Sequence, residues 1–199
     1  MSSPPLLAQS NKAPQSGPQL LVLGDSLSAE YGLPRGTGWV TLLGNQLRKE
    51  GSSWQITNAS ISGETTAGGL ARLPALLQQH KPDAVLVELG GNDGLRGFAI
   101  DTIKSNLSQI ITLVQQHNAM PVLMQIRIPP NYGPRYGQQF SNIYPQLAET
   151  HQITLWPFFM DDIAVNSELM LQDGIHPNSK AQPLISEFVG KLLAEFETE

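Results

Sequence analysis

Short apolar runs alternate with amphipathic stretches along most of the chain, and this alternation limits its fold more than any other feature. The expected strands are residues 19–23, 54–58, 83–89, 121–126 and 153–156. Apolar residues recur at helical spacing over 39–50, 70–77, 103–114 and 140–150, and again from Asn178, the expected N-cap of the last helix. Alternation of this kind predicts a three-layer α/β/α domain around a central parallel sheet of about five strands.

The composition fits one globular domain and excludes several classes of protein. The chain has 199 residues, which we divide into a flexible tail over 1–18 and a domain over 19–199. No apolar run approaches the roughly 18 residues of a membrane span, so stable membrane insertion is not expected. The net charge is −5 and the basic residues are scattered, which argues against a nucleic-acid partner. Without cysteine, disulfides and thiolate catalysis are excluded.

Polar residues gather in three loops, each following one of the first three expected strands. The loops read Gly-Asp-Ser-Leu-Ser over 24–28, Ala-Ser-Ile-Ser-Gly over 59–63 and Gly-Gly-Asn-Asp over 90–93. The carboxyl ends of parallel strands open on one edge of the sheet, where α/β proteins bind their ligands. We therefore expect the three loops to converge.

Of the four histidines, His176 is the strongest candidate for a general base. His80, His117 and His151 each fall at the carboxyl end of an expected helix, where interaction with the helix dipole explains them. His176 instead lies in the turn Asp-Gly-Ile-His-Pro-Asn over 173–178, three residues after Asp173. A carboxylate there can orient the imidazole and stabilise its protonated form, although such a turn can equally be structural.

Ser26 is the candidate nucleophile. It follows Gly24 and Asp25 at an expected helix N-terminus, so helix capping is the structural alternative. Asp25 is expected to bind the loop backbone rather than to act in catalysis. The chain has no G-x-S-x-G sequence, which excludes the nucleophile elbow of the α/β-hydrolases.

Two further residues are candidate donors to an oxyanion, Gly63 through its backbone N–H and Asn92 through its side-chain amide. The structural alternatives are a turn glycine at 63 and a tight turn with positive φ over 90–93. Their occurrence at strand ends, in this order with the serine and the histidine, favours the catalytic interpretation.

Four short blocks of the sequence together resemble the SGNH (GDSL) hydrolase family. The blocks are GDSLS at 24–28, NASISGET at 58–65, GGND at 90–93 and DGIHP at 173–177, and the likeness covers essentially all of 19–199. The resemblance implies a nucleophile at Ser26 whose backbone N–H is also an oxyanion donor. It implies further oxyanion donors at Gly63 and Asn92, and a triad completed by Asp173 and His176.

Longer stretches at 70–82, 87–98 and 123–136 resemble the multifunctional thioesterases, lysophospholipases and arylesterases of the bacterial periplasm. This likeness also implies a mobile substrate-binding loop over 75–80, whereas helical spacing alone places Leu76 and Leu77 in the core. Glu30 and residues 32–36 depart from what we expect after the first block, which affects substrate entry rather than the chemistry.

The resemblance implies a serine esterase that needs no metal or organic cofactor. Its expected partners are small-molecule acyl thioesters, short-to-medium chain and aryl esters, and lysophospholipids, which it cleaves through an acyl-enzyme on Ser26. A monomer located in the periplasm, or secreted, is expected. Two alternatives stay open: a carbohydrate O-deacetylase on the same scaffold, and a non-catalytic binding domain.

Overall fold

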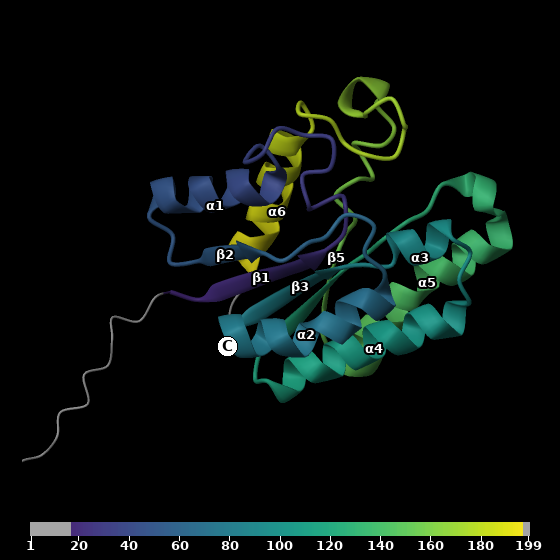
Figure 1. Cartoon of the computed structure of the whole chain (residues 1–199), viewed down its shortest axis with the longest axis horizontal. Coiled ribbons are helices and arrows are strands. Elements are labelled where there is room, and N and C mark those ends of the chain that lie inside the picture. The colour runs from purple at the N-terminus through teal and green to yellow at the C-terminus, as the bar shows by residue number, and fades with distance from the viewer. Residues whose placement is uncertain (1–16, 197–199) are drawn as a thin grey trace, which may run out of the picture.

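The computed structural model describes residues 17–196, which form one five-stranded sheet with every neighbouring pair of strands parallel (Figure 1). The strand order is β2-β1-β3-β4-β5. The strands are β1 (Gln19–Gly24), β2 (Gln55–Asn58), β3 (Ala84–Glu88), β4 (Met120–Met124) and β5 (Thr154–Trp156). Each lies within two residues of the range predicted from the sequence. The predicted tail falls almost wholly outside the described residues.

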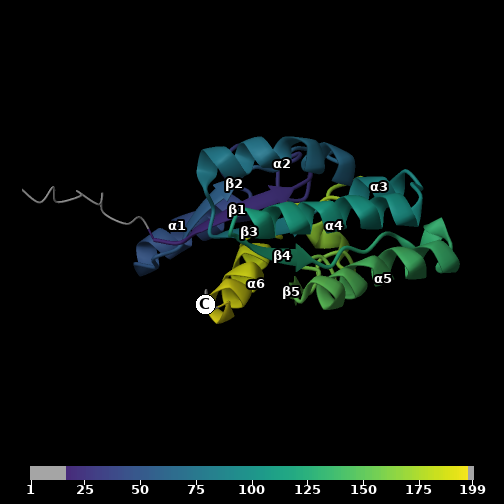
Figure 2. The same cartoon turned by 90° about the horizontal axis from the view of Figure 1, so that it is seen from below.

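Helices cover both faces of this sheet, which confirms the predicted α/β/α layering. The α-helices are α1 (Trp39–Glu50), α2 (Thr66–His80), α3 (Gly91–Leu95), α4 (Ile100–Gln116), α5 (Pro134–His151) and α6 (Gln182–Glu195), and the 3₁₀ helices are η1 (Pro130–Tyr132) and η2 (Ser167–Leu169). α1 and α6 pack together on one face, while α2, α4 and α5 lie side by side on the other (Figure 2). None of the helices in the described part of the chain is long and apolar enough to cross a membrane.

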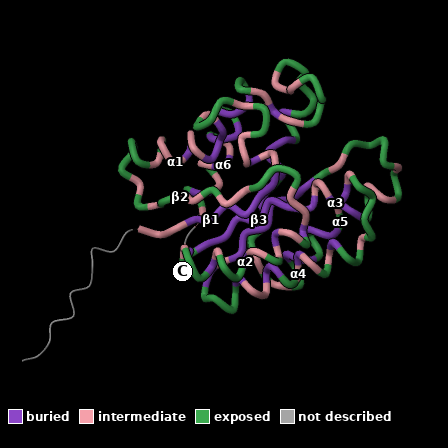
Figure 3. The backbone as a smooth tube through the Cα atoms, in the orientation of Figure 1, coloured by how far each residue is buried: buried purple, intermediate pink, exposed green. Residues whose placement is uncertain are grey.

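The core follows the central strands, as the continuous buried trace through β1 and β3 shows (Figure 3). All five residues of β3 and the last five of β1 are buried. Strands covered by helices on both faces bury both sets of side chains, which is why they read as unbroken apolar runs. The polar exception is Glu88 at the end of β3, which is also fully buried.

The strand order reverses between β1 and β3. From β1 the chain passes to β2 on one side, then crosses to β3 and continues outward to β4 and β5. In open α/β sheets ligands bind outside the carboxyl ends of the strands at such a reversal, because the loops there diverge to opposite faces. Ser26 follows β1 and Asn92 lies in α3, just after β3. The fold therefore places two of the candidate residues at its most favourable position for a site.

Two helix starts differ from the sequence-based expectation. The Pro/Gly-rich composition of residues 129–137 predicts a loop there, but α5 begins within it, at Pro134. Proline is tolerated in the first turn of a helix, where its missing N–H would have no intrahelical acceptor. α6 begins at Gln182, so the predicted N-cap at Asn178 is wrong. The Asn178 side chain instead accepts the N–H of Lys180 at 2.9 Å and donates to carbonyls in the segment 168–170.

The segment 75–80 forms the last part of α2, so the expectation of a mobile loop there is wrong. Leu77 is 2% exposed and belongs to the core, in agreement with helical spacing. α2 ends at His80, shortly before β3 begins at Ala84. These residues therefore lie near the amino end of β3, opposite the edge that carries Ser26.

The loops at the candidate site are also more structured than expected. Ser26 lies in a turn rather than at a helix N-terminus, because the backbone of Glu30 has a φ of 60° and interrupts any helix there. Residues 91–95 form the short helix α3. Positive φ in the Gly-Gly-Asn-Asp block is confined to Gly90, at 114°, so Asn92 itself is helical.

Candidate active site

Three side chains that are distant in the sequence form a continuous chain of hydrogen bonds. The Ser26 Oγ lies 2.9 Å from Nε2 of His176, and Nδ1 of the same ring lies 2.7 Å from Oδ2 of Asp173. The structure thus brings together the predicted nucleophile, base and orienting carboxylate. The His176 side chain is 16% exposed, so the ring is sheltered but reachable.

Hydrogen bonds within the loop 173–178 lower the pKa of its acidic residue, Asp173. Partial burial raises the pKa of the Asp173 carboxyl, but hydrogen bonds from the N–H groups of His176 and Ile175 and from the His176 ring outweigh it and hold the pKa at about 2. An ionised carboxylate can only accept hydrogen bonds, so Nδ1 of His176 must carry a proton. The lone pair of Nε2 is then left facing the Ser26 hydroxyl. This is the tautomer that a general base requires.

Asp25 is held away from the relay and serves the backbone, as predicted. Its Oδ1 accepts the N–H of Leu27 at 3.0 Å, and its Oδ2 accepts the side-chain amide of Asn92 at 3.0 Å. Burial raises the pKa of Asp25 to about 6, against the lowering effect of these two hydrogen bonds. The contact to Asn92 fixes the amide beside the loop that carries Ser26.

The loop after β2 is anchored to both of its neighbours. The N–H of Ile61 donates to the carbonyl of Gly24 at 3.1 Å. At the start of α2, Thr66 donates from its N–H and its hydroxyl to Asp93, at 2.9 and 2.6 Å. Gly63 lies between these anchors in an exposed turn, and within the described residues neither its N–H nor that of Ser26 donates a hydrogen bond. Both N–H groups are therefore unpaired donors within the described residues.

Sequence reasoning missed Glu88, the last residue of β3, whose buried carboxyl contacts the loop of Ser26. Its Oε2 accepts the hydroxyl of Ser28 at 2.8 Å and the N–H of Asp25 at 3.3 Å. A Cβ on Gly24 would lie 2.6 Å from this oxygen, so glycine at 24 makes room for the carboxyl. The available signal was one acidic residue closing an otherwise apolar strand.

Gln182 and Tyr31 also support the site and were missed. Gln182 is 1% exposed; it accepts the N–H of Trp39 at 3.0 Å and donates to the carbonyl of Pro177, which links α1 to the loop of His176. The ring of Tyr31 packs on that of His176 with centroids 4.2 Å apart. Both contacts join segments distant in sequence, so no local pattern could reveal them.

Glu30, which departs from the expected pattern, is a structural residue of the same loop. Its carboxylate accepts the N–H groups of Gly36 and Gly38 at 2.8 and 2.9 Å and the hydroxyl of Thr41 at 3.0 Å. It therefore fixes the connection from the Ser26 turn to α1.

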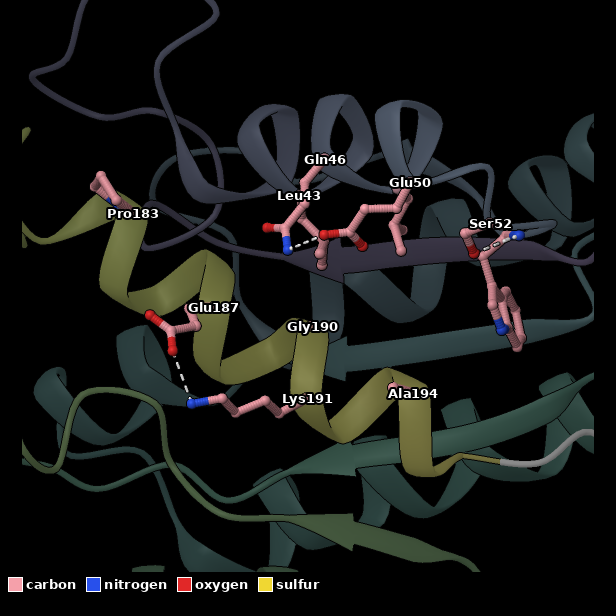
Figure 4. Close-up of a pocket in the computed structure, with 11 residues that line it drawn as sticks. Leu43, Gln46, Glu50, Ser52, Pro183, Glu187, Gly190, Lys191 and Ala194 are labelled. Carbon is pink, nitrogen blue, oxygen red and sulfur yellow. Dashed lines mark hydrogen bonds and ion pairs between the residues drawn. The ribbon is translucent and has the colours of Figure 1, made fainter.

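A separate groove of about 660 Å³ lies between α1 and α6 (Figure 4). Its walls carry two polar pairs, Gln46 with Glu50 on α1 and Glu187 with Lys191 on α6. Trp54, which also lines it, immediately precedes β2, so the groove extends toward the amino ends of the strands. It does not include the residues of the Ser26 site.

The chain belongs to the GDSL-like Lipase/Acylhydrolase family, whose pattern it matches over residues 22–183. It is 52% identical over 183 residues to an arylesterase of Vibrio mimicus, covering 92% of each chain. It is also 52% identical over 174 residues to thioesterase 1/protease 1/lysophospholipase L1 of Escherichia coli K12, covering 87% of this chain and 82% of the relative.

Solved structures agree with this assignment. The psychrotrophic esterase EstA of a Pseudoalteromonas species, in a form inhibited by monoethylphosphonate, superposes with a TM-score of 0.88 at 49% identity, covering 89% of this chain and 97% of EstA. A structure of AlinE4, an SGNH-hydrolase family esterase, gives a TM-score of 0.75 at 36% identity, covering 93% of this chain and all of AlinE4.

Proposed function

We propose that this protein is a serine esterase that hydrolyses acyl thioesters, short-to-medium chain and aryl esters, and lysophospholipids. The observation that carries the proposal is the Ser26–His176–Asp173 relay, with contacts of 2.9 and 2.7 Å. A serine whose hydroxyl faces the free nitrogen of an oriented imidazole is an activated nucleophile.

In the proposed reaction, Ser26 Oγ attacks the acyl carbonyl while its proton passes to Nε2 of His176. The imidazolium is stabilised by Asp173, which stays ionised because its pKa is about 2. The tetrahedral intermediate collapses, and His176 returns the proton to the departing alcohol or thiol. Water then adds to the serine ester and gives its proton to the same nitrogen. The second tetrahedral intermediate collapses, the acid leaves, and His176 returns that proton to Ser26 Oγ.

Negative charge on the acyl oxygen needs donors that are already in place before attack. The proposed donors are the backbone N–H groups of Ser26 and Gly63 and the side-chain amide of Asn92. An amide has two N–H bonds. One Nδ2–H of Asn92 is held by Asp25 at 3.0 Å, which orients the group and leaves the other for substrate.

The substrate classes rest on the relatives, whose names include arylesterase, thioesterase and lysophospholipase. The proposal places the enzyme in the periplasm as a monomer that binds small-molecule substrates and no nucleic acid, which rests on the family resemblance and the net charge of −5. Cell fractionation and light scattering test location and oligomeric state.

The decisive experiment is labelling of the purified protein with a fluorophosphonate, followed by peptide mapping. We expect one equivalent of label on Ser26, none in Ser26→Ala, and hydrolysis of C2 to C12 p-nitrophenyl esters and acyl-CoA thioesters. A protein that is not labelled and cleaves none of these esters would contradict the proposal. Strong preference for an acetylated oligosaccharide over every simple ester would indicate an O-deacetylase instead.

A further inference from the structure

Glu88 is a buried acid that the proposed reaction does not use. It closes β3 with 0% exposure, and its carboxyl lies directly beneath the turn that contains Ser26. One oxygen, Oε2, accepts two hydrogen bonds, from Ser28 Oγ at 2.8 Å and from the N–H of Asp25 at 3.3 Å. The two donors flank Ser26 in the sequence, so this carboxyl spans the turn.

The turn itself is short, and other contacts also hold it: the N–H of Leu27 and the amide of Asn92 each donate to the Asp25 carboxyl at 3.0 Å. The carbonyl of Asp25 accepts the N–H groups of Ser28 and Ala29 at 3.2 and 2.9 Å, which closes the chain around Ser26. From outside the turn, Asn58 donates to the carbonyl of Ser28 at 2.8 Å. Glu88 is the group that binds both the entry and the exit of the turn.

The Glu88 carboxyl can bind the turn in its uncharged form. Burial, followed by the nearby carboxyl of Asp25, raises the pKa of Glu88 well above its usual value. Its second oxygen, Oε1, is buried without a hydrogen-bond partner in the described part of the chain. A neutral carboxyl tolerates such burial far better than a carboxylate, and its carbonyl oxygen still accepts both hydrogen bonds.

An apolar side chain at position 88 would match the rest of the strand and avoid the free-energy cost of burying a polar group. The chain instead carries an acid there and a glycine at 24, where a Cβ would lie 2.6 Å from Oε2. Packing explains the glycine but not the acid at 88, whereas holding the turn explains the acid.

We propose that Glu88 is a positioning residue for the nucleophile. By binding the Ser28 hydroxyl and the Asp25 N–H, it fixes the turn in which Ser26 directs its Oγ toward His176 and its N–H toward the acyl oxygen. This proposal rests on the proposed function of Ser26.

The test compares Glu88→Gln with Glu88→Leu by kcat, KM and the rate of fluorophosphonate labelling, measured well below each melting temperature. Glutamine keeps a neutral acceptor oxygen, so kcat should stay within about threefold of wild type. Leucine removes the acceptor, so we expect kcat and the labelling rate to fall together by at least tenfold while KM changes less than twofold.

Gln125→Leu is the matched control. Gln125 is a buried polar residue just after β4, and its amide donates to the carbonyls of Ile126 and Ser141, outside the nucleophile turn. We expect it to lower the melting temperature without changing kcat.

A folded Glu88→Leu enzyme with wild-type kcat and labelling would overturn the positioning role. If Glu88→Leu does not fold, Ser28→Ala decides the question, because it removes one donor and leaves β3 intact. Unchanged kcat in Ser28→Ala would then reject the proposal. Failure of the proposed function is recognised separately, by the absence of label on Ser26 in the wild type.

Discussion

Two aspartates at the site show how strongly the surroundings control the pKa of a side chain. Asp173 receives two backbone N–H groups and an imidazole, which hold its pKa at about 2 although partial burial opposes this. Burial dominates at Asp25 and raises its pKa to about 6, despite hydrogen bonds from Leu27 and Asn92. Asp173 in the proposed relay therefore stays charged at neutral pH, whereas Asp25 in the nucleophile loop has a pKa of about 6.

Replacement of Ser26 by alanine tests the nucleophile directly. Removing Oγ leaves nothing to form the acyl-enzyme, so turnover of p-nitrophenyl butyrate should fall below a tenth of wild type with an unchanged melting temperature. Ser62→Ala is the control, because Ser62 is an exposed serine in the neighbouring loop after β2. A folded Ser26→Ala protein with more than a tenth of the activity would reject the assignment.

Asn92→Ala tests electrostatic stabilisation of the intermediate. A donor that acts only on charge developing in the transition state should affect kcat and leave KM nearly unchanged. The expected fall in kcat is about 10²–10³-fold, the usual effect of losing one oxyanion donor. Fluorophosphonate should still label Ser26 slowly, because His176 and Asp173 are untouched. A kcat within threefold of wild type would show that Asn92 only supports the loop.

The raised pKa of Asp25 predicts a dependence of stability on pH. The folded protein holds this proton more tightly than the unfolded chain does, so the stabilisation is complete below about pH 4 and is lost as the pH rises through 6. The rise in the pKa of Asp25 from its ordinary value of 3.8 to about 6 corresponds to about 3 kcal/mol. Urea unfolding of wild type and Asp25→Asn between about pH 4 and 7 measures it. The free energy of unfolding should fall less in the variant, and equal slopes would contradict the assignment.

At the scale of elements, regular periodicity predicted what the structure shows, and misleading single residues account for the errors at the starts of α5 and α6. The helix predicted to end before Gly51 does so, with that glycine in the left-handed conformation at its cap. The prolines and glycines around Pro134 predict a loop, yet Pro134 begins α5. Asn178 is a good capping residue, but hydrogen bonds to carbonyls in the segment 168–170 engage its amide before α6 starts. The carbonyls that bind Asn178 lie ten and eight residues away in the sequence, so local propensity could not predict them.

Because residues 75–80 are helical, substitutions there should change the stability of the fold without changing the preference for acyl chain length. Leu77→Ala should lower the free energy of unfolding by about 2–5 kcal/mol, the usual effect of truncating a buried leucine. The ratio of kcat/KM for C4 and C8 esters should stay the same, because this part of α2 lies near the amino end of β3. Gln78→Ala, on the exposed face of the same helix, is the control. A changed C4/C8 ratio with unchanged stability would indicate a substrate-binding segment.

For the whole molecule, the sheet order explains why the convergence of the three segments could be predicted. Once the strands are parallel, the segments after β1, β2 and β3 must share an edge; Ser26 and Gly63 lie in the first two, and Asn92 lies in α3 just after β3. The supporting residues Glu88 and Gln182 could not be inferred in the same way. Glu88 contacts residues 60 or more positions away and Gln182 contacts Trp39 143 positions away, so only the folded chain brings them to the site.

The separation of the α1/α6 groove from the catalytic edge predicts that filling it leaves activity intact. Ala194 is exposed near the end of α6 and lines the groove, where a larger side chain can enter without moving the sheet. We expect Ala194→Tyr to keep kcat and KM within twofold of wild type in an ester hydrolysis assay. A tenfold loss in a folded variant would show that the groove communicates with Ser26.

The sequence separation within the relay has a consequence for truncation. His176 follows Ser26 by 150 residues, after all five strands. A chain cut before residue 173 would keep every strand and the turn of Ser26 but lose both Asp173 and His176. It would also lose α6, which packs against α1. Removal of the final segment of the chain therefore takes away the proposed base and its orienting acid without removing any strand of the sheet.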